Sequence, residues 1–201
     1  MATKKSHVGR NVLLVILVVL ITYGGILAWS AYNVRGHATQ ASARMQECVA
    51  QIQREDLGSA YASAQTAEHE LSVAKSELQG WQWALASHVP VVCDDVRCAQ
   101  QSTDVADVLV RDALLPVIGQ ARDLASVDVA NEGIGALASG FTRLTALVGA
   151  ASDARGVVRD GKVRVAAIPK AHINELNELV KNLSEVIDKA DSALGAAGAA
   201  A

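Results

Sequence analysis

The chain opens with a long uncharged segment that constrains its fold more than any other feature. Residues Asn11–Val34 carry no charged side chain, and Lys4, Lys5 and Arg10 precede them. A hydrocarbon core of about 30 Å needs roughly 20 helical residues to cross it. Because a backbone can cross lipid only when its polar groups are paired internally, we expect this segment to be a transmembrane helix.

The charges on either side of the segment predict its orientation. Three basic residues lie before it, whereas Arg35 is the only basic residue close behind it. The positive-inside bias then places residues 1–10 in the cytoplasm, residues 11–34 in the membrane and the rest of the chain outside. Trp29 and Tyr32 fall at the expected outer boundary, where aromatic rings with polar tips are enriched.

A cleaved signal peptide is the competing interpretation. Such a peptide has an apolar core of about 7–15 residues, followed closely by a cleavage site of small residues. Here the apolar core is longer, and Ala41-Ser42-Ala43 lies far beyond its end. We therefore expect an uncleaved signal anchor.

Two small residues of the anchor, Gly24 and Ala28, are spaced four positions apart. This small-xxx-small pattern allows two membrane helices to approach closely. A packing contact at these residues, and with it a homo-oligomer, is one hypothesis, although the pattern is also common by chance.

The exterior part is acidic and poor in aromatic residues. After residue 35 the chain holds 14 basic and 21 acidic side chains, a net charge of −7, and aromatic residues make up only 3% of the whole chain. The negative charge argues against nucleic acid and anionic lipid as partners. Abundant alanine with few aromatic residues favours closely packed helices over sheets.

Apolar residues recur along the exterior part at alternating steps of three and four, which is the helical heptad pattern. We expect an all-α fold, in which the membrane helix leads into an elongated antiparallel helical bundle or coiled coil over residues 35–194. Asp56 is the expected N-cap of the first long helix. The seam of that helix is formed by Leu57, Ala60, Ala64, Ala67, Leu71, Ala74, Leu78, Trp81 and Leu85.

Two breaks, at residues 88–95 and 127–133, separate the later helices. Asp94 or Asp95 is expected to cap the second helix, Pro116 to kink it or end it early, and Pro169 to begin the last helix. The tail after residue 194 is expected to fray. The later seams are Val96, Ala99, Thr103, Ala106, Val110, Ala113 and Val117, then Ile134, Leu137, Phe141, Leu144, Val148 and Ala151, then Ile173, Leu176, Val180, Leu183, Ile187, Ala190 and Leu194.

One stretch departs from the helical pattern. In residues 157–165, valines alternate with basic residues around Asp160-Gly161, which is typical of a β-hairpin. Because an isolated hairpin is marginally stable in water, a helix–loop–helix connection is the favoured alternative. The basic residues of this region are expected to lie in a solvated loop.

Several segments together resemble a family of bacterial, mostly actinobacterial, membrane proteins, known as domain of unknown function four thousand and twelve. The resemblance implies an envelope location and a helical region, and covers the chain from the anchor to about Leu194. The family usually has glycine at the position of Cys93 and continues into a large extracytoplasmic domain beyond the last residues of this chain. The segments that carry it are Arg54–Leu57, Trp81–Trp83, Val89–Arg97, Val105–Asp107 and Ala113–Pro116.

The cysteines provide the only candidate covalent site. Cys48, Cys93 and Cys98 are all expected to face an oxidising exterior. A local disulfide between Cys93 and Cys98 would stabilise the turn between two helices. Cys48 would then be a buried free thiol or, in a dimer, bridge to its own copy.

No catalytic, cofactor-binding or metal-binding pattern is present in the sequence. The cysteines lack the close second pair of a zinc site, and the histidines lack ligand spacing. There is no phosphate-binding loop, nucleophile elbow or paired-carboxylate signature. We therefore expect neither an enzyme nor a cofactor.

The sequence favours a membrane-anchored envelope protein with a structural role or a role in docking an unknown envelope partner. A sensory or regulatory ectodomain that acts through a partner is the first alternative. A remnant of a longer envelope protein is the second. A small-molecule binding module is disfavoured because the alanine-rich seams leave little room for a cavity.

Overall fold

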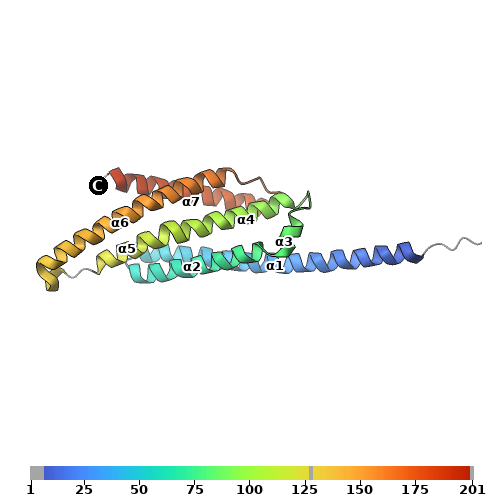
Figure 1. The fold of residues 1–201 in the computed structure, drawn as a ribbon, viewed down its shortest axis with the longest axis horizontal. Coiled ribbons are helices and arrows are strands. Elements are labelled where there is room, and N and C mark those ends of the chain that lie inside the picture. Colours follow the sequence, from blue (N-terminus) through green and yellow to red (C-terminus); the bar gives the residue numbers. More distant parts are fainter. Residues whose placement is uncertain (1–6, 127–128, 200–201) are drawn as a thin grey trace, which may run out of the picture.

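In a computed structural model the protein is all-helical over the residues that the structure describes. These are residues 7–126 and 129–199 for the backbone, and residues 17–126 and 139–195 for the side chains. The predicted all-α fold is confirmed (Figure 1). The elements are α1 (His7–Gln53), α2 (Leu57–Leu78), α3 (Trp81–Ala86), α4 (Cys93–Val108), the π-helix η1 (Leu109–Leu114), α5 (Leu115–Ala125), α6 (Val129–Ala166) and α7 (Asn174–Ala199).

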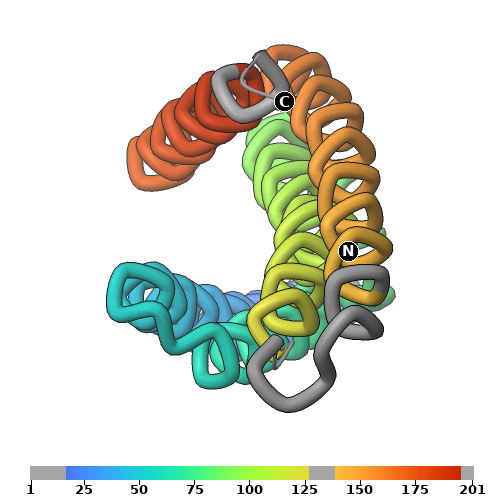
Figure 2. The backbone as a smooth tube through the Cα atoms, turned by 90° about the vertical axis from the view of Figure 1, so that its left-hand side faces the viewer, coloured from blue at the N-terminus to red at the C-terminus, as the bar shows by residue number. Residues whose placement is uncertain are grey.

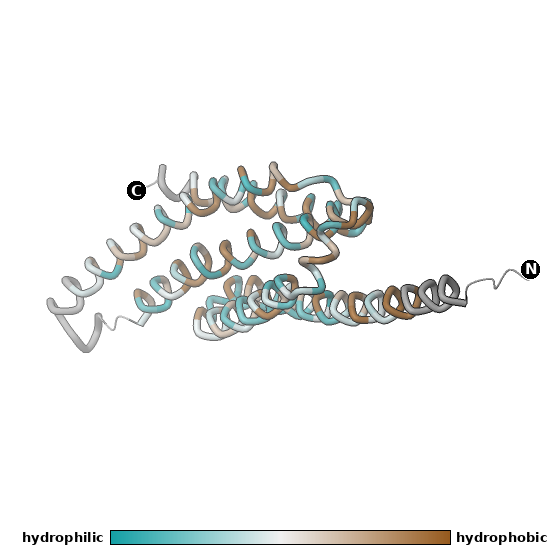
Figure 3. The backbone as a smooth tube through the Cα atoms, turned by 45° about the vertical axis from the view of Figure 1, so that its right-hand side comes forward, coloured by the Kyte–Doolittle hydropathy of each residue, from teal (hydrophilic) through white to brown (hydrophobic). Residues whose placement is uncertain are grey.

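α1 is a single helix of 47 residues, of which the N-terminal part is exposed and the C-terminal part packs against α2. Its N-terminal part projects away from the other helices and is strongly hydrophobic (Figures 1 and 3). Val18 and Ile21 in this part are 61% and 66% exposed. By length and composition the described part of α1 is able to cross a membrane.

The other helices pack into an elongated, curved bundle (Figure 2). α2 returns along α1, the run α4–η1–α5 covers α2, and α6 and α7 pack on the far side of that run. Among the described residues, the α1–α2 pair makes no extended contact with α7. The chain exposes 12843 Å², against about 9,000 Å² expected for a compact monomer of its mass.

Small residues allow α1 and α2 to approach closely. Ala41 on α1 and Ala60, Ala64 and Ala67 on α2 are almost completely buried. The predicted seam is confirmed from Ala60 to Leu78, where α2 ends. The last two predicted seam residues, Trp81 and Leu85, are instead exposed because the short helix α3 takes a different direction.

The turn before α2 follows the expected capping chemistry. The Asp56 carboxylate accepts a hydrogen bond from the Ser59 backbone N–H at 3.0 Å, which confirms Asp56 as the N-cap. Hydrogen bonds from the side chain and the backbone of Ser59 lower the pKa of Asp56. Glu55, just before it, has a φ of 62°, a left-handed conformation that links α1 to α2.

The favoured helix–loop–helix connection at residues 157–165 is wrong, and so is the alternative hairpin, because α6 continues through the whole stretch. Val158, Gly161 and Val165 are buried on one face of that helix. A Cβ on Gly161 would lie 3.3 Å from Leu109 Cδ2, so this glycine allows α6 to pack closely against η1. The basic residues pair with α4 and α7 instead of lying in a loop.

Pro116 interrupts the regular α-helix as predicted, and it does so by a change of helix type. Proline has no N–H and its ring clashes with the carbonyl four residues earlier in a regular α-helix. The chain widens into the π-helix η1 and restarts as α5, with Pro116 in the first turn of the new helix. The predicted kink is thus a change of helix type.

The start of α7 and the capping of α4 differ from the expected ones. α7 begins at Asn174 and not near Pro169, because Asp95 accepts hydrogen bonds from the His172 and Ile173 N–H groups at 2.6 and 3.1 Å. Asp95 therefore serves the start of α7, and α4 has no side-chain cap.

The predicted break at 127–133 is shorter than expected. α6 already begins at Val129, and residues 127–128 lie outside the described residues. α7 continues to Ala199, so the described part of the tail is helical.

Candidate functional site

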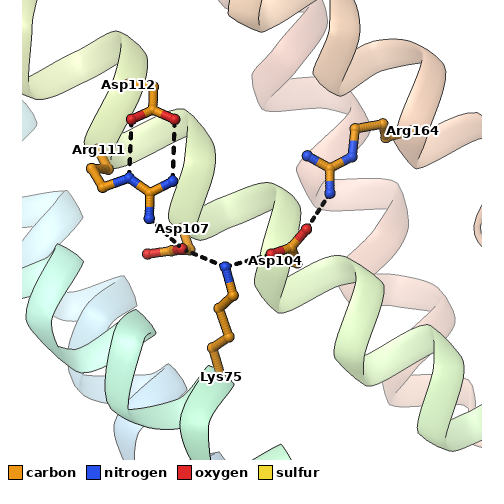
Figure 4. Close-up of polar contacts among 6 residues, drawn as sticks. All are labelled: Lys75, Asp104, Asp107, Arg111, Asp112 and Arg164. Atoms are coloured by element: carbon orange, nitrogen blue, oxygen red, sulfur yellow. Dashed lines mark hydrogen bonds and ion pairs between the residues drawn. The ribbon is translucent and has the colours of Figure 1, made fainter. Parts of the chain in front are cut away.

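A network of charged side chains joins four elements at the centre of the bundle (Figure 4). Three are cationic and three anionic, so the network is neutral overall. They are Lys75 on α2, Asp104 and Asp107 on α4, Arg111 and Asp112 on η1, and Arg164 on α6.

Lys75 bridges the two carboxylates of α4. Its Nζ lies 2.5 Å from Asp104 Oδ1 and 3.0 Å from Asp107 Oδ2. Asp104 also accepts a hydrogen bond from the Arg164 guanidinium on α6. Asp104 is therefore bound from α2 on one side and from α6 on the other, which ties three helices together.

Asp107 is the most deeply buried member, with 1% of its surface exposed. Its Oδ2 also lies 3.2 Å from Arg111 Nη1, and Arg111 in turn holds Asp112 through two hydrogen bonds of 3.0 and 3.2 Å. The other carboxylate oxygen, Asp107 Oδ1, is buried without a hydrogen-bond partner.

The network shifts the pKa values of its members in the directions expected for ion pairs. Hydrogen bonds to Asp104 and Asp107 raise the pKa of Lys75. Burial works to raise the pKa of Asp104, but the hydrogen bonds from Lys75 and Arg164 outweigh it and leave that pKa lowered. The bond to Asp112 raises the pKa of Arg111. All three shifts favour the charged forms.

An open depression of about 360 Å³ lies beside the network. Lys75 and Asp104 form one side of it, and Gln100 donates a hydrogen bond to the Leu78 carbonyl at 2.7 Å across it. Asp104 is the one carboxylate among the lining residues, and it is paired with Lys75 and Arg164. These ion pairs hold α2, α4 and α6 together.

The cysteines are free thiols in this structure. Cys93 and Cys98 both belong to α4, and residues five apart in a regular helix have Cα atoms roughly 9 Å apart. A disulfide tolerates about 7 Å at most, so oxidation would require the first turn of α4 to unwind. The bond stays a prediction. Burial raises the pKa of Cys98 and of Cys48.

Gly24 and Ala28 lie on the exposed surface of α1. A Cβ on Gly24 would have no neighbour within 4 Å. The face is therefore open in a single chain, and a contact with another membrane helix there stays a prediction.

Sequence reasoning did not bring the members of the charged network together: Arg164 was expected in a solvated loop, and Asp107 entered only through the family resemblance. Lys75 and Asp107 are 32 residues apart on different helices, so no local spacing connects them. The one available signal is the four-residue spacing of Asp107 and Arg111, which is common on solvated helices. Within the described ranges, no three His, Cys, Asp or Glu side chains are grouped as metal ligands would be.

The comparisons with known proteins add no assignment to this geometry: no family model, no curated protein and no solved structure matches the chain.

Proposed function

We propose that this protein is a membrane-anchored structural protein of the bacterial cell envelope, and that its helical bundle docks an envelope partner outside the plasma membrane. α1 crosses the membrane once, with the N-terminus in the cytoplasm. The observation that carries the proposal is the continuity of α1, in which one helix of 47 residues is first an exposed apolar rod and then the first helix of the bundle.

This continuity supports a spacer function. A helix without a break transmits its direction to the elements packed on it, and the α1–α2 contact is formed by buried alanines that leave little freedom. The charged network then ties α2 to α4 and α6. The bundle is held in one orientation to the membrane, and anchoring raises its effective concentration for partners there.

A stripe on α6 is the candidate docking surface for a partner helix. Phe141, Leu144 and Val148 are 72%, 46% and 49% exposed and recur at steps of three and four. They are part of a predicted heptad seam, yet no other described helix covers them. An exposed apolar stripe with helical spacing is the usual recognition surface for an amphipathic helix.

Site-specific photo-cross-linking in cells tests the docking role. A photoreactive side chain at Phe141 should give one discrete cross-linked product, identified by mass spectrometry as an envelope protein. The matched control is Asp153, which is also exposed on α6 but lies on the opposite side from Leu144. A product containing only this chain would make it a homo-oligomeric structural element, and equal products at both positions would contradict a specific surface.

A regulatory ectodomain is the second candidate, and η1 is the observation that favours it. π-helices frequently occur at functional sites. This one adjoins the buried network, and packed helices transmit small shifts between two arrangements.

A further inference from the structure

α3 and the turn after it, residues 81–92, form an apolar surface that no other described part of the protein covers. Residues 78–93 carry no charged side chain, which makes them the longest uncharged stretch after the candidate span. Trp81, Leu85 and Val91 are 61%, 55% and 70% exposed. In water such a cluster would be unfavourable, and large exposed apolar patches mark interaction sites.

Hydrogen bonds fix this surface to the candidate membrane span itself. Tyr23 Oη donates to the backbone carbonyl of Gln82 at 2.6 Å, and Trp83 Nε1 donates to Ser30 Oγ at 2.9 Å. The rings of Tyr23 and Trp81 lie 6.3 Å apart. Both α1 partners fall within residues 11–34, so α3 lies at the level of the outer part of the span.

The length of a membrane helix sets the depth of this level. A run of roughly 20 residues that starts at Asn11 ends at Ser30, which puts Tyr23 in the outer half of the run. Ser30 also donates a hydrogen bond to the Glu77 carboxylate at 3.1 Å, and a carboxylate belongs with water or headgroups. α3 therefore lies alongside the outer half of the span, at the depth of the outer leaflet.

The arrangement of the helices agrees with this level. The turn between α3 and α4 lies at the end of the bundle from which α1 projects (Figure 1). Tryptophan and tyrosine prefer the membrane interface because their rings are apolar and their N–H and O–H groups are polar. Tyr23, Trp81 and Trp83 supply three such rings, and both tryptophans contact the part of α1 between Tyr23 and Ser30.

We propose that residues 81–92 are a second membrane-contact element, which inserts Trp81, Leu85 and Val91 into the outer leaflet of the same bilayer that α1 crosses. The inference rests on the proposed membrane insertion of α1. The ligand is the headgroup–acyl boundary of phospholipid. Because the element has no charged side chain, insertion depends on apolar contact and is insensitive to salt and to lipid charge.

Fluorescence quenching in proteoliposomes tests the proposal with the full chain. The protein has three tryptophans, so two double substitutions each leave one reporter. Trp29→Phe with Trp83→Phe leaves Trp81, and Trp81→Phe with Trp83→Phe leaves Trp29 on α1. In phosphatidylcholine brominated near the headgroup end of its acyl chains, Trp81 should lose most of its fluorescence and its emission should shift to the blue.

The Trp29 reporter separates the failure of this inference from the failure of the proposed function. If Trp29 is quenched and Trp81 is not, α1 is inserted and α3 lies in water, which overturns the inference alone. If neither is quenched, the membrane anchor itself fails, and the inference fails with it. Circular dichroism of each variant shows whether the helices are retained.

A second measurement avoids any loss of the Trp83 hydrogen bond. A photoreactive diazirine side chain is placed at Val91 or, as a control, at Val163 on α6; these valines are 70% and 69% exposed. The side chain at Val91 should form a covalent adduct with phospholipid, and the one at Val163 should not. Adducts to a second copy of the chain at Val91, without lipid adducts, would show a protein partner and overturn the proposal.

Discussion

At the residue scale, the clearest physical tension is the burial of the Asp107 carboxylate. Removing a carboxylate from water costs several kcal/mol unless cations and hydrogen bonds replace the lost hydration. Lys75 and Arg111 both bind Oδ2, but Oδ1 has no partner. The ion pairs of Asp107 with Lys75 and Arg111 therefore specify how α2, α4 and η1 pack against each other more than they add to the stability of the fold.

The first prediction concerns this carboxylate. Removing one member of a buried ion pair costs about 3–5 kcal/mol, but Lys75 and Arg111 would keep Asp104 and Asp112 as partners, so we expect Asp107→Asn to cost about 2 kcal/mol. For a chain of this length that lowers the melting temperature by about 4–8 °C. Thermal unfolding in detergent, followed by circular dichroism, measures it.

The matched control is Asp112→Asn, which removes a carboxylate that is 45% exposed and paired with the same Arg111. Surface pairs of this kind contribute about 0–1 kcal/mol. Equal losses in the two variants would contradict the special role of Asp107.

The second prediction concerns pH. Because the pKa of Asp104 is lowered in the folded state, its contribution to stability is present above the unfolded value of about 3.9 and is lost as the pH falls through the lowered one. The raised pKa of Lys75 has the opposite sign: its contribution is present below the unfolded value of about 10.4 and is lost as the pH rises through the raised one.

Denaturant midpoints measured across pH should therefore fall at both acidic and alkaline extremes. Asp104→Asn should flatten the acidic fall, because the group that titrates there is gone. It should also weaken the alkaline fall, since Lys75 loses a partner. An unchanged acidic fall in this variant would show that other carboxylates dominate.

At the scale of helices, the sequence predicted elements well where one face alone is buried. The seam of α2 is confirmed up to Leu78 because α2 buries one face, whose Ala60 and Ala64 pack with Cys48 and Ile118. The seam of α4 is confirmed only in part: Val96 is buried as expected, but Cys98 and Val105 are buried too. α4 lies between α2 and the α6–α7 pair, and a helix enclosed on two sides has no single seam.

The hairpin-like pattern at residues 157–165 is misleading for a related reason. Valines around Asp160-Gly161 alternate as in a strand, yet Val158, Gly161 and Val165 also follow helical spacing. Local pattern alone could not decide between the two, and packing against η1 and α7 does. The charged network could not be predicted from local pattern either, because its contacts depend on how α2, α4, η1 and α6 are rotated against each other.

The third prediction tests the close packing of α6 on η1. Gly156→Ala, where a Cβ meets no atom within 4 Å, should stabilise the protein by about 0.5–1 kcal/mol through helix propensity. Gly161→Leu should instead destabilise it by about 1–3 kcal/mol, because the side chain would have to displace Leu109. Thermal unfolding of the two variants measures both effects.

If Gly161→Leu were as stable as the original chain, the approach of α6 to η1 would be looser than the structure shows. Gly161→Ala is the intermediate case, in which a contact of 3.3 Å offsets part of the propensity gain.

At the scale of the whole molecule, two of the apolar surfaces that the described residues leave exposed differ in character. The α6 stripe around Phe141 lies on a long helix and suits another helix. The surface of α3 is uncharged and hydrogen-bonded to the span, which suits lipid. Under the two proposals, the end of the bundle near α3 is its membrane side and the α6 stripe is accessible to a partner.

The most direct test of the account is the topology of the intact protein in cells. In a Cys93→Ser background, a cysteine replacing Val163, which is 69% exposed, is treated with a membrane-impermeant maleimide; Cys48 and Cys98 are buried. A cysteine replacing Ser6 reports the other end. We expect labelling at position 163 in intact cells and at position 6 only after permeabilisation. Protection of position 163 until permeabilisation would place the bundle in the cytoplasm and contradict the account.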